Sequence, residues 1–270
     1  MPTRLLSLSN VSVIAHRGGS RLRPENTMAA FDHAVALGVD AIECDVHLSR
    51  DDEVVVIHDA TLERTTDATG PVAALSADEL ARVDAGYRFG EAEGYPFRGR
   101  GFGVPRLADL MRRHARLPFV VEIKGAGERT ASRVVEVLEE LGALDRVILG
   151  GFSDEAVRAA RRLAPTVPTS ASSSEVQSAL RRAMFRLAPT RTGYDLFQVP
   201  FRLRGRQIFG RGFVRTALRA GLGVQAWIVD EEADVRRLVA WGVTGIISDR
   251  PDVAMRVVHG GGGAAGSGSS

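Results

Sequence analysis

The chain has 270 residues, of which 44% are hydrophobic and 25% are charged, and its net charge at neutral pH is +2. This composition is typical of a soluble globular protein with a sizeable core, and so small a charge does not indicate a nucleic-acid binder. No run approaches the roughly 18 apolar residues of a membrane span, and the N-terminus lacks the apolar segment of a secretory signal. We therefore expect a cytoplasmic protein without a transmembrane helix. A single cysteine, Cys44, excludes an intrachain disulfide.

Apolar runs typical of strands alternate with segments whose apolar residues recur at helical spacing. The predicted strands are Val11–Ala15, Ala41–Leu48, Val54–Ile57, Phe119–Ile123, Val147–Gly151, Leu196–Val199, Val224–Val229 and Gly245–Ile247, with Thr169–Ala171 as a weaker candidate. The predicted helices are Thr27–Leu37, Leu107–Ala115, Arg129–Leu141, Asp154–Leu163, Glu175–Leu187, Phe213–Ala220 and Ala233–Trp241. Strand–helix units with short connections predict an α/β fold, which at this length closes into a (β/α)8 TIM barrel over residues 11–258.

Three parts of the chain do not fit a regular barrel. Nine strands are predicted for eight positions, and only Arg50–Glu53 separates the second strand from the third. That gap has no room for a crossover helix. Either a hairpin with Asp51-Asp52 as its two-residue turn places Asp45 opposite His58, or parallel pairing brings the two side chains together at the barrel mouth. Residues 60–104 are rich in glycine and are expected to form a small insertion over the C-terminal mouth. Residues 260–270 contain only Gly, Ala and Ser and are expected to be disordered.

The first predicted strand ends in a histidine and an arginine. His16 offers a titratable ring, and Arg17 offers a bidentate clamp for phosphate. The carboxyl ends of barrel strands are where such folds build active sites. Taken alone, the pair also fits a packed histidine beside a surface arginine.

The second strand has two carboxylates on one face. Glu43 and Asp45 lie two residues apart, so both project to one side while Cys44 points to the other. Two inward acids in an apolar strand are costly unless a cation compensates. A structural salt bridge is one explanation, and a divalent cation with oxygen ligands is the one that we favour.

Two further apolar strands end in charged or titratable residues. Val54–Ile57 leads into His58, and Phe119–Ile123 brings Glu122 and then Lys124 to one face. Lys124 is the only lysine among 35 basic residues, and its compact ammonium suits a phosphate oxygen. The four segments together predict two histidines, an arginine, a lysine and three carboxylates at one end of the barrel.

These motifs resemble the glycerophosphodiester phosphodiesterase family over nearly the whole folded chain, from about Ile14 to Asp252. The matching series is His16-Arg17-Gly18, Pro24-Glu25-Asn26-Thr27, Glu43-x-Asp45, His58-Asp59, Arg64-Thr65-Thr66, Glu122-x-Lys124 and Ser248-Asp249-Arg250-Pro251-Asp252. Two segments depart from the pattern. Trp227-Ile228-Val229-Asp230 stands where many relatives have Trp-Thr-Val-Asn, and Ala217-Leu218-Arg219 stands where they often have Ala-His-Arg.

The resemblance implies a TIM-barrel hydrolase that converts glycerophosphodiesters to sn-glycerol 3-phosphate and an alcohol. It implies one divalent ion, Mg2+ or Ca2+ with Mn2+ as an alternative, held by Glu43, Asp45 and Glu122. It also implies acid/base roles for His16 and His58.

The same resemblance implies phosphate contacts from Arg17 and Lys124. Around these residues we expect supporting contacts from Glu25, Asn26 and Asp59. Gln198 and Trp227 end late strands and are candidates for contact with the alcohol portion, although Trp227 fits a core position equally well.

Other functions stay open at this point. The helix Glu175–Leu187 places Arg181, Arg182 and Arg186 beside apolar residues, so a lysophospholipase D weakly associated with a membrane surface is the main alternative to an ordinary barrel helix. A catalytically silent ligand-binding barrel would not need both histidines. A metal-dependent sugar isomerase or aldolase would explain the acids but not the His-Arg-Gly opening. The sequence leaves undecided which histidine is the acid, whether water or a glycerol hydroxyl attacks, the head-group preference and the oligomeric state.

Overall fold

The computed structural model describes residues 6–125, 127–190 and 193–260. Of the tail predicted over residues 260–270, Gly260 caps α9 (Pro251–His259) and the remainder lies outside the described residues. A parallel sheet forms the centre of the molecule, with strand order β5-β4-β2-β1-β10-β9-β6. Its strands are β1 (Ser12–Ala15), β2 (Ala41–Leu48), β4 (Phe119–Ile123), β5 (Val147–Gly150), β6 (Leu196–Pro200), β9 (Gly223–Trp227) and β10 (Gly245–Ser248). The predicted alternation of strands and helices is therefore present.

The weak strand candidate near Thr169 closes the ring. Thr169 forms a parallel bridge to Leu149 of β5, and Ser170 forms one to Leu196 of β6. These residues occupy the eighth position, between the two ends of the seven-stranded path. The described strands therefore form the predicted (β/α)8 barrel.

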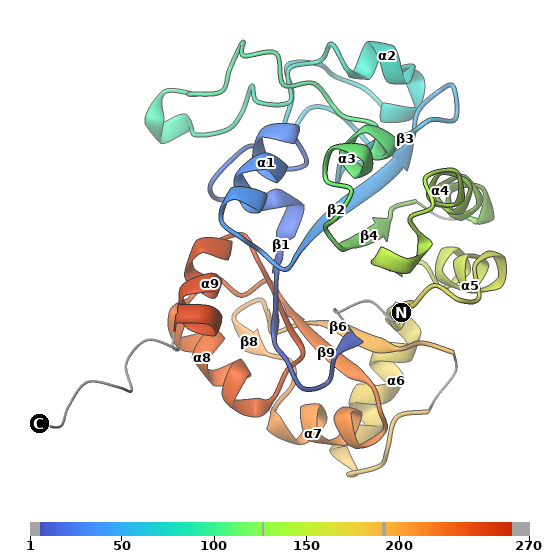
Figure 1. The fold of residues 1–270 in the computed structure, drawn as a ribbon, viewed down its shortest axis with the longest axis vertical. Helices are drawn as coiled ribbons and strands as arrows, with labels where there is room; N and C mark the ends of the chain where they lie inside the picture. Colours follow the sequence, from blue (N-terminus) through green and yellow to red (C-terminus); the bar gives the residue numbers. More distant parts are fainter. Residues whose placement is uncertain (1–5, 126, 191–192, 261–270) are drawn as a thin grey trace, which may run out of the picture.

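Helices surround the barrel (Figure 1). They are α1 (Met28–Ala36), α3 (Leu107–Arg113), α4 (Glu128–Glu140), α5 (Asp154–Leu163), α6 (Ser173–Met184), α7 (Arg211–Arg219), α8 (Glu232–Trp241) and α9 (Pro251–His259). Successive side chains of each strand point alternately outward to the helices and inward to the barrel, so the apolar residues form two layers. In β1, Val13 packs in the large cluster beneath the helices, whereas Ile14 belongs to a separate small cluster with Val120 and Ile148. The helix α9, which begins at Pro251, extends the predicted set.

Of the nine predicted strands, Val54–Ile57 is the one that does not belong to the barrel. It forms β3 (Val54–Val56), which pairs antiparallel with β2 as a hairpin. The register pairs Val46 with Val56, and Ile57 N donates to Asp45 O at 3.0 Å. Asp45 therefore lies opposite Ile57, and the prediction that it lies opposite His58 is wrong by one position. The turn has three residues instead of two: Ser49 N donates to Glu53 O, and Asp52 within the turn has φ of 62°.

The predicted insertion, residues 60–104, lies between β3 and α3 and contributes no strand to the barrel. It includes the short helix α2 (Ala77–Leu80) and has an apolar cluster of its own, formed by Val55, Ile57, Leu62, Val72, Ala77, Leu80, Ala85 and Val104. It lies at the top of Figure 1, beside α1 and α3. A second addition follows β6, where β7 (Arg202–Leu203) and β8 (Arg206–Gln207) form a short hairpin that the sequence did not predict.

Candidate active site

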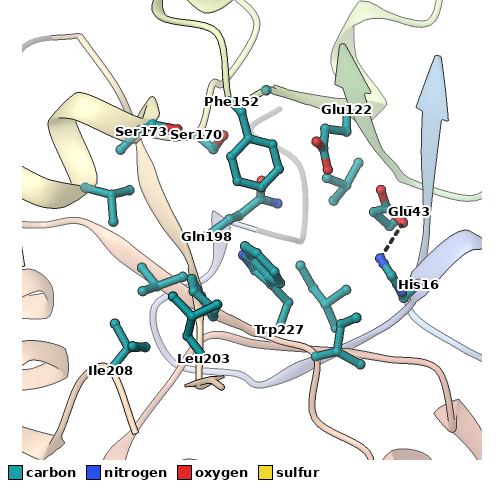
Figure 2. A pocket seen from close by; sticks show the side chains of 18 of the residues that line it. His16, Glu43, Glu122, Phe152, Ser170, Ser173, Gln198, Leu203, Ile208 and Trp227 are labelled. Atoms are coloured by element: carbon teal, nitrogen blue, oxygen red, sulfur yellow. Dashed lines mark ion pairs between the residues drawn. The ribbon is translucent and has the colours of Figure 1, made fainter. Parts of the chain in front are cut away.

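Six of the seven charged or histidine residues predicted for the site line one cavity of about 430 Å3, and the seventh, Asp45, contacts two of them. It lies at the carboxyl end of the barrel strands, where TIM barrels hold their active sites. Most of its polar lining comes from the strands and the loops that follow them, and α6 adds two residues: His16, Arg17, Glu43, His58, Glu122, Lys124, Ser170 and Gln198, with Ser173 and Gln177 from α6. Figure 2 shows His16, Glu43 and Glu122 on one side of the cavity. The volume lies within the ~300–1,000 Å3 range of small-molecule sites.

Three carboxylates lie close enough to share one cation. Glu43, Asp45 and Glu122 each offer an oxygen within 4.8 Å of the others, because parallel pairing of β2 with β4 sets Asp45 opposite Glu122. Burial, together with repulsion from Asp45, raises the pKa of Glu43 well above its usual value. Its Oε1 is buried and receives no hydrogen bond from the described residues. A buried oxygen without a donor and three carboxylates fit a divalent cation.

Two cationic side chains adjoin the same acids. Lys124 Nζ lies 3.0 Å from Asp45 Oδ1 and 2.5 Å from Glu122 Oε1. Arg17 Nε lies 3.1 Å from Asp45 Oδ2, to which Asn26 Nδ2 donates at 2.9 Å. Burial alone would raise the pKa of Asp45, but Lys124 and Arg17 outweigh it and hold the pKa below its usual value. Asp45 is therefore ionised and fixes both cations at the wall of the cavity.

His16 is oriented by a carboxylate from the far end of the chain. Its Nδ1 lies 2.6 Å from Oδ1 of Asp249, which follows β10, and Ser20 Oγ donates to the same oxygen. The opposite ring nitrogen, Nε2, lies 3.9 Å from Glu43 Oε2. Burial would lower the pKa of His16, but Glu43 and Asp249 together raise it above its usual value. The ring is therefore held with Nε2 toward the acid cluster.

His58 is paired with an aspartate in the same way. Its Nδ1 lies 2.5 Å from Oδ1 of Asp59, and Arg64 Nε donates to the other carboxylate oxygen. Arg64 also donates to both oxygens of Glu25 at 2.8 Å, and Arg17 Nη1 donates to Glu25 at 2.9 Å. Burial would raise the pKa of Asp59, but Arg64 and His58 lower it to about 2. In both rings Nε2 is the nitrogen that no described hydrogen bond uses.

The loop after β1 needs an unusual backbone. Arg17 has φ of 51° and Gly18 has φ of 81°. A Cβ on Gly18 would lie 2.7 Å from Ala30 Cβ and 2.9 Å from Phe31 Cδ1, so only glycine allows α1 to pack this closely. The turn directs Arg17 N–H to Glu43 Oε2 at 2.9 Å. The His-Arg-Gly motif therefore shapes the backbone of the site as well as its side chains.

Gln198, in the middle of β6, and Trp227, the last residue of β9, both line the cavity, so only Trp227 ends its strand as predicted. Gln198 Nε2 donates to Gln225 Oε1 at 2.9 Å. The rings of Trp227 and Phe152 pack edge to face, with centroids 5.9 Å apart and planes at 89°. Lys124 Nζ lies 5.5 Å from the Phe152 centroid, so the aromatic pair adjoins the charged side of the cavity (Figure 2).

Three residues of this arrangement were assigned no role from the sequence. Asp249 and Arg64 belong to motifs of the family resemblance, so their presence was visible but their partners were not. Phe152 lies in the loop between β5 and α5 and has no charged neighbour before Asp154 that would mark it. The signal for Phe152 is its place directly after a barrel strand.

The chain is similar to known proteins over most of its length. The model of the Glycerophosphoryl diester phosphodiesterase family matches residues 16–253. A glycerophosphodiester phosphodiesterase of Caldanaerobacter subterraneus subsp. tengcongensis is 31% identical over 255 residues, covering 93% of this chain and 98% of that protein.

Two solved structures are similar in fold and sequence. The glycerophosphodiester phosphodiesterase of Agrobacterium tumefaciens str. C58 is 29% identical with a TM-score of 0.71, covering 90% of this chain and 98% of that one. An Oleispira antarctica phosphodiesterase, solved in complex with the product sn-glycerol-3-phosphate, is 25% identical with a TM-score of 0.75, covering 92% and 96%. Within the described ranges, this chain has no helix of the length and apolar character needed to cross a bilayer.

Proposed function

The chain belongs to the glycerophosphoryl diester phosphodiesterase family, and on this premise we propose that it hydrolyses glycerophosphodiesters with one divalent metal ion and two histidines. The products would be sn-glycerol 3-phosphate and an alcohol. The main support is the convergence of three carboxylates within 4.8 Å beside two imidazoles that each contact an aspartate through Nδ1. The product bound to the Oleispira antarctica relative is the same phosphate monoester.

The proposed metal ligands are Glu43, Asp45 and Glu122. All three supply hard oxygen donors, which suit Mg2+ or Ca2+, with Mn2+ as the alternative. When bound, such an ion neutralises a phosphodiester and stabilises charge that develops on its oxygens.

Arg17 and Lys124 are proposed to bind the phosphate oxygens. Both line the cavity and both are fixed by Asp45. The guanidinium offers two parallel donors to a phosphate, and the ammonium offers a compact point charge. Two cations held in place before the substrate arrives need no reorganisation as negative charge develops, which is the basis of electrostatic stabilisation.

His16 and His58 are proposed to move the protons. One imidazole would deprotonate the attacking oxygen, of water or of the neighbouring glycerol hydroxyl, and the other would protonate the departing alkoxide. Each such contribution is worth roughly 10²–10⁴-fold in rate. Asp249 accepts a hydrogen bond from Nδ1 of His16, and Asp59 accepts one from Nδ1 of His58. These bonds keep both rings in the tautomer and orientation that leave Nε2 for the substrate. Gln198 and Trp227 would contact the alcohol portion.

A metal-controlled assay with a panel of glycerophosphodiesters tests this proposal. We expect release of sn-glycerol 3-phosphate to stop after metal is removed with EDTA and to return with Mg2+, Mn2+ or Ca2+. Glu122→Gln should block the return, whereas Glu128→Gln, an exposed acid on α4 that pairs with Arg162, should behave like the wild type. Turnover by a metal-stripped sample would exclude metal dependence, and inactivity on every diester would exclude the proposed reaction.

A further inference from the structure

Arg64 does not line the cavity, yet its guanidinium contacts two sides of the active site. One edge, formed by Nε and Nη2, donates to the two oxygens of Asp59 at 2.5 and 3.2 Å. The other edge, formed by Nη1 and Nη2, donates to the two oxygens of Glu25 at 2.8 Å each. Asp59 contacts His58, and Glu25 contacts Arg17. Arg64 therefore connects a proposed proton-transfer residue to a proposed phosphate ligand.

The backbone of the insertion holds Arg64 in place. Arg64 lies within a turn that is closed by Thr66, whose N and Oγ1 donate to Leu62 O at 3.1 and 2.8 Å. Leu62 and Thr66 are both fully buried, and Leu62 belongs to the apolar cluster of the insertion. Because the backbone is anchored on both sides of Arg64, less conformational entropy is lost when its side chain is fixed.

The two histidines differ in how much support they receive from the rest of the protein. The side chains of His16 and Asp249 are 10% and 16% exposed, and a serine hydroxyl also donates to Asp249. The side chains of His58 and Asp59 are 31% and 30% exposed. Among the described residues, Asp59 accepts hydrogen bonds only from His58 and Arg64. The orientation of the more exposed pair therefore depends on Arg64.

Two other roles fit this geometry less well. Direct contact with the substrate is disfavoured, because the Arg64 side chain lies outside the cavity lining and all three of its nitrogens donate to carboxylates. A role in stability alone is also disfavoured, because Arg64 is 47% exposed and solvent screens such ion pairs. An arginine that bonds to two carboxylates from different loops fixes the position of one loop relative to the other.

We propose that Arg64 is a positioning residue, which holds the Asp59–His58 pair in place relative to the loop after β1. The insertion then supports catalysis without touching the substrate. This inference rests on the proposed function, because Arg64 acts through the proposed roles of His58 and Arg17. Without Arg64, Arg17 keeps its contact with Asp45, whereas Asp59 keeps only its bond to His58 among the described residues. The loss should therefore lower kcat more than it raises KM.

Arg64→Ala and Arg64→Lys test this role with glycerophosphocholine as substrate. We expect kcat to fall about 10–100-fold in both, since a small displacement of a catalytic group has effects of this size, and KM to stay within about threefold. Lysine keeps the charge, but its single ammonium does not reproduce the planar fork that bonds to two carboxylates. The matched control is Arg113→Ala, which should keep the wild-type kcat and KM. Arg113 is 56% exposed, donates to both oxygens of Asp32 at 2.6 and 2.8 Å and does not line the cavity.

Two further measurements separate positioning from a general loss of stability. The Tm of Arg64→Ala should match that of Arg113→Ala, because exposed ion pairs contribute little to stability. Guanidinium ion, added far below its denaturing range, should restore part of kcat in Arg64→Ala, because it can occupy the space between the two carboxylates. The same addition should not raise kcat in the wild type or in Arg113→Ala, and sodium chloride at equal ionic strength should restore nothing.

The outcomes separate this inference from the proposed function. If Arg64→Ala keeps the wild-type kcat, or if Arg64→Lys restores it fully, the positioning role is wrong and the phosphodiesterase proposal stands. A loss of kcat that guanidinium does not reverse, together with a Tm well below that of Arg113→Ala, would make Arg64 a structural residue and overturn the inference. So would a higher KM with an unchanged kcat, which indicates substrate binding. If the wild type hydrolyses no diester, the proposed function fails and this inference fails with it.

Discussion

Asp249→Asn tests how the structure orients His16. The substitution preserves shape but removes the negative charge that lies 2.6 Å from His16 Nδ1. An asparagine amide can also donate to Nδ1, which would move the ring proton to Nε2. We therefore expect kcat for glycerophosphocholine to fall strongly while KM changes little.

The size of the effect follows from the hydrogen bond that is lost. A hydrogen bond to a charged group is worth about 1.5–3 kcal/mol, which corresponds to roughly 10–150-fold in rate if it is fully expressed in the transition state. Asp249 also raises the pKa of His16. Its removal should therefore shift the limb of the pH–rate profile that reports His16 to lower pH, whichever role the ring has.

Stability gives a second measurement. The raised pKa of His16 stabilises the fold below 6.5 and loses this effect as the pH rises through the folded value. The lowered pKa of Asp249 stabilises the fold above 3.8 and loses this effect as the pH falls through the folded value. For metal-free protein, the difference in unfolding free energy between wild type and Asp249→Asn should therefore be largest between these limits.

Asp252→Asn is the matched control. Asp252 lies in the same segment, but its carboxylate accepts hydrogen bonds from Arg250 and not from a histidine. It should retain kcat and the wild-type pH profile. A wild-type kcat with an unshifted profile in Asp249→Asn would refute the orienting role of this residue.

Three further predictions concern the metal, the second histidine and the backbone. A divalent ion at 100 times its Kd should stabilise the wild type by about 2.7 kcal/mol but have little effect on Glu43→Gln, and equal thermal shifts would contradict the proposed ligands. His58→Ala should lower kcat by roughly 10²–10⁴-fold with a near-wild-type Tm, since the side chain is 31% exposed; wild-type turnover would exclude its acid/base role. Gly18→Ala should lose about 2–5 kcal/mol in urea unfolding through its positive φ and its clash with Ala30. Gly125→Ala has the same φ of +81° with no atom within 4 Å and should lose only about 1–2 kcal/mol, so equal losses would contradict the packing argument.

The convergence of the acids could be predicted because strand alternation is a local property. Residues two apart in a strand share a face, so Glu43 and Asp45 had to project together, and so did Glu122 and Lys124. A barrel then brings the carboxyl ends of its strands to one rim. The pairing of Asp45 with Glu122 follows directly from the parallel register of β2 and β4.

The remaining details depend on contacts that local patterns do not encode. Arg50 joins Asp51 and Asp52 in a three-residue turn, which moves the partner of Asp45 from His58 to Ile57. No apolar pattern distinguishes a two-residue turn from a three-residue turn. The strand at Thr169 was the weaker candidate in the sequence, and in the structure it pairs with its neighbours only through single bridges. Its place became clear only when both of its neighbours were in position.

By itself the sequence determined the alternation of strands and helices and the side to which each acid points, since both depend on the period of the backbone. Only the tertiary structure decided that Asp249 orients His16, because the two residues are 233 positions apart and meet only where β10 lies beside β1. It also decided which residues line the cavity opposite the acids, because α6, the β7–β8 hairpin and Trp227 of β9 meet there only once the barrel has closed.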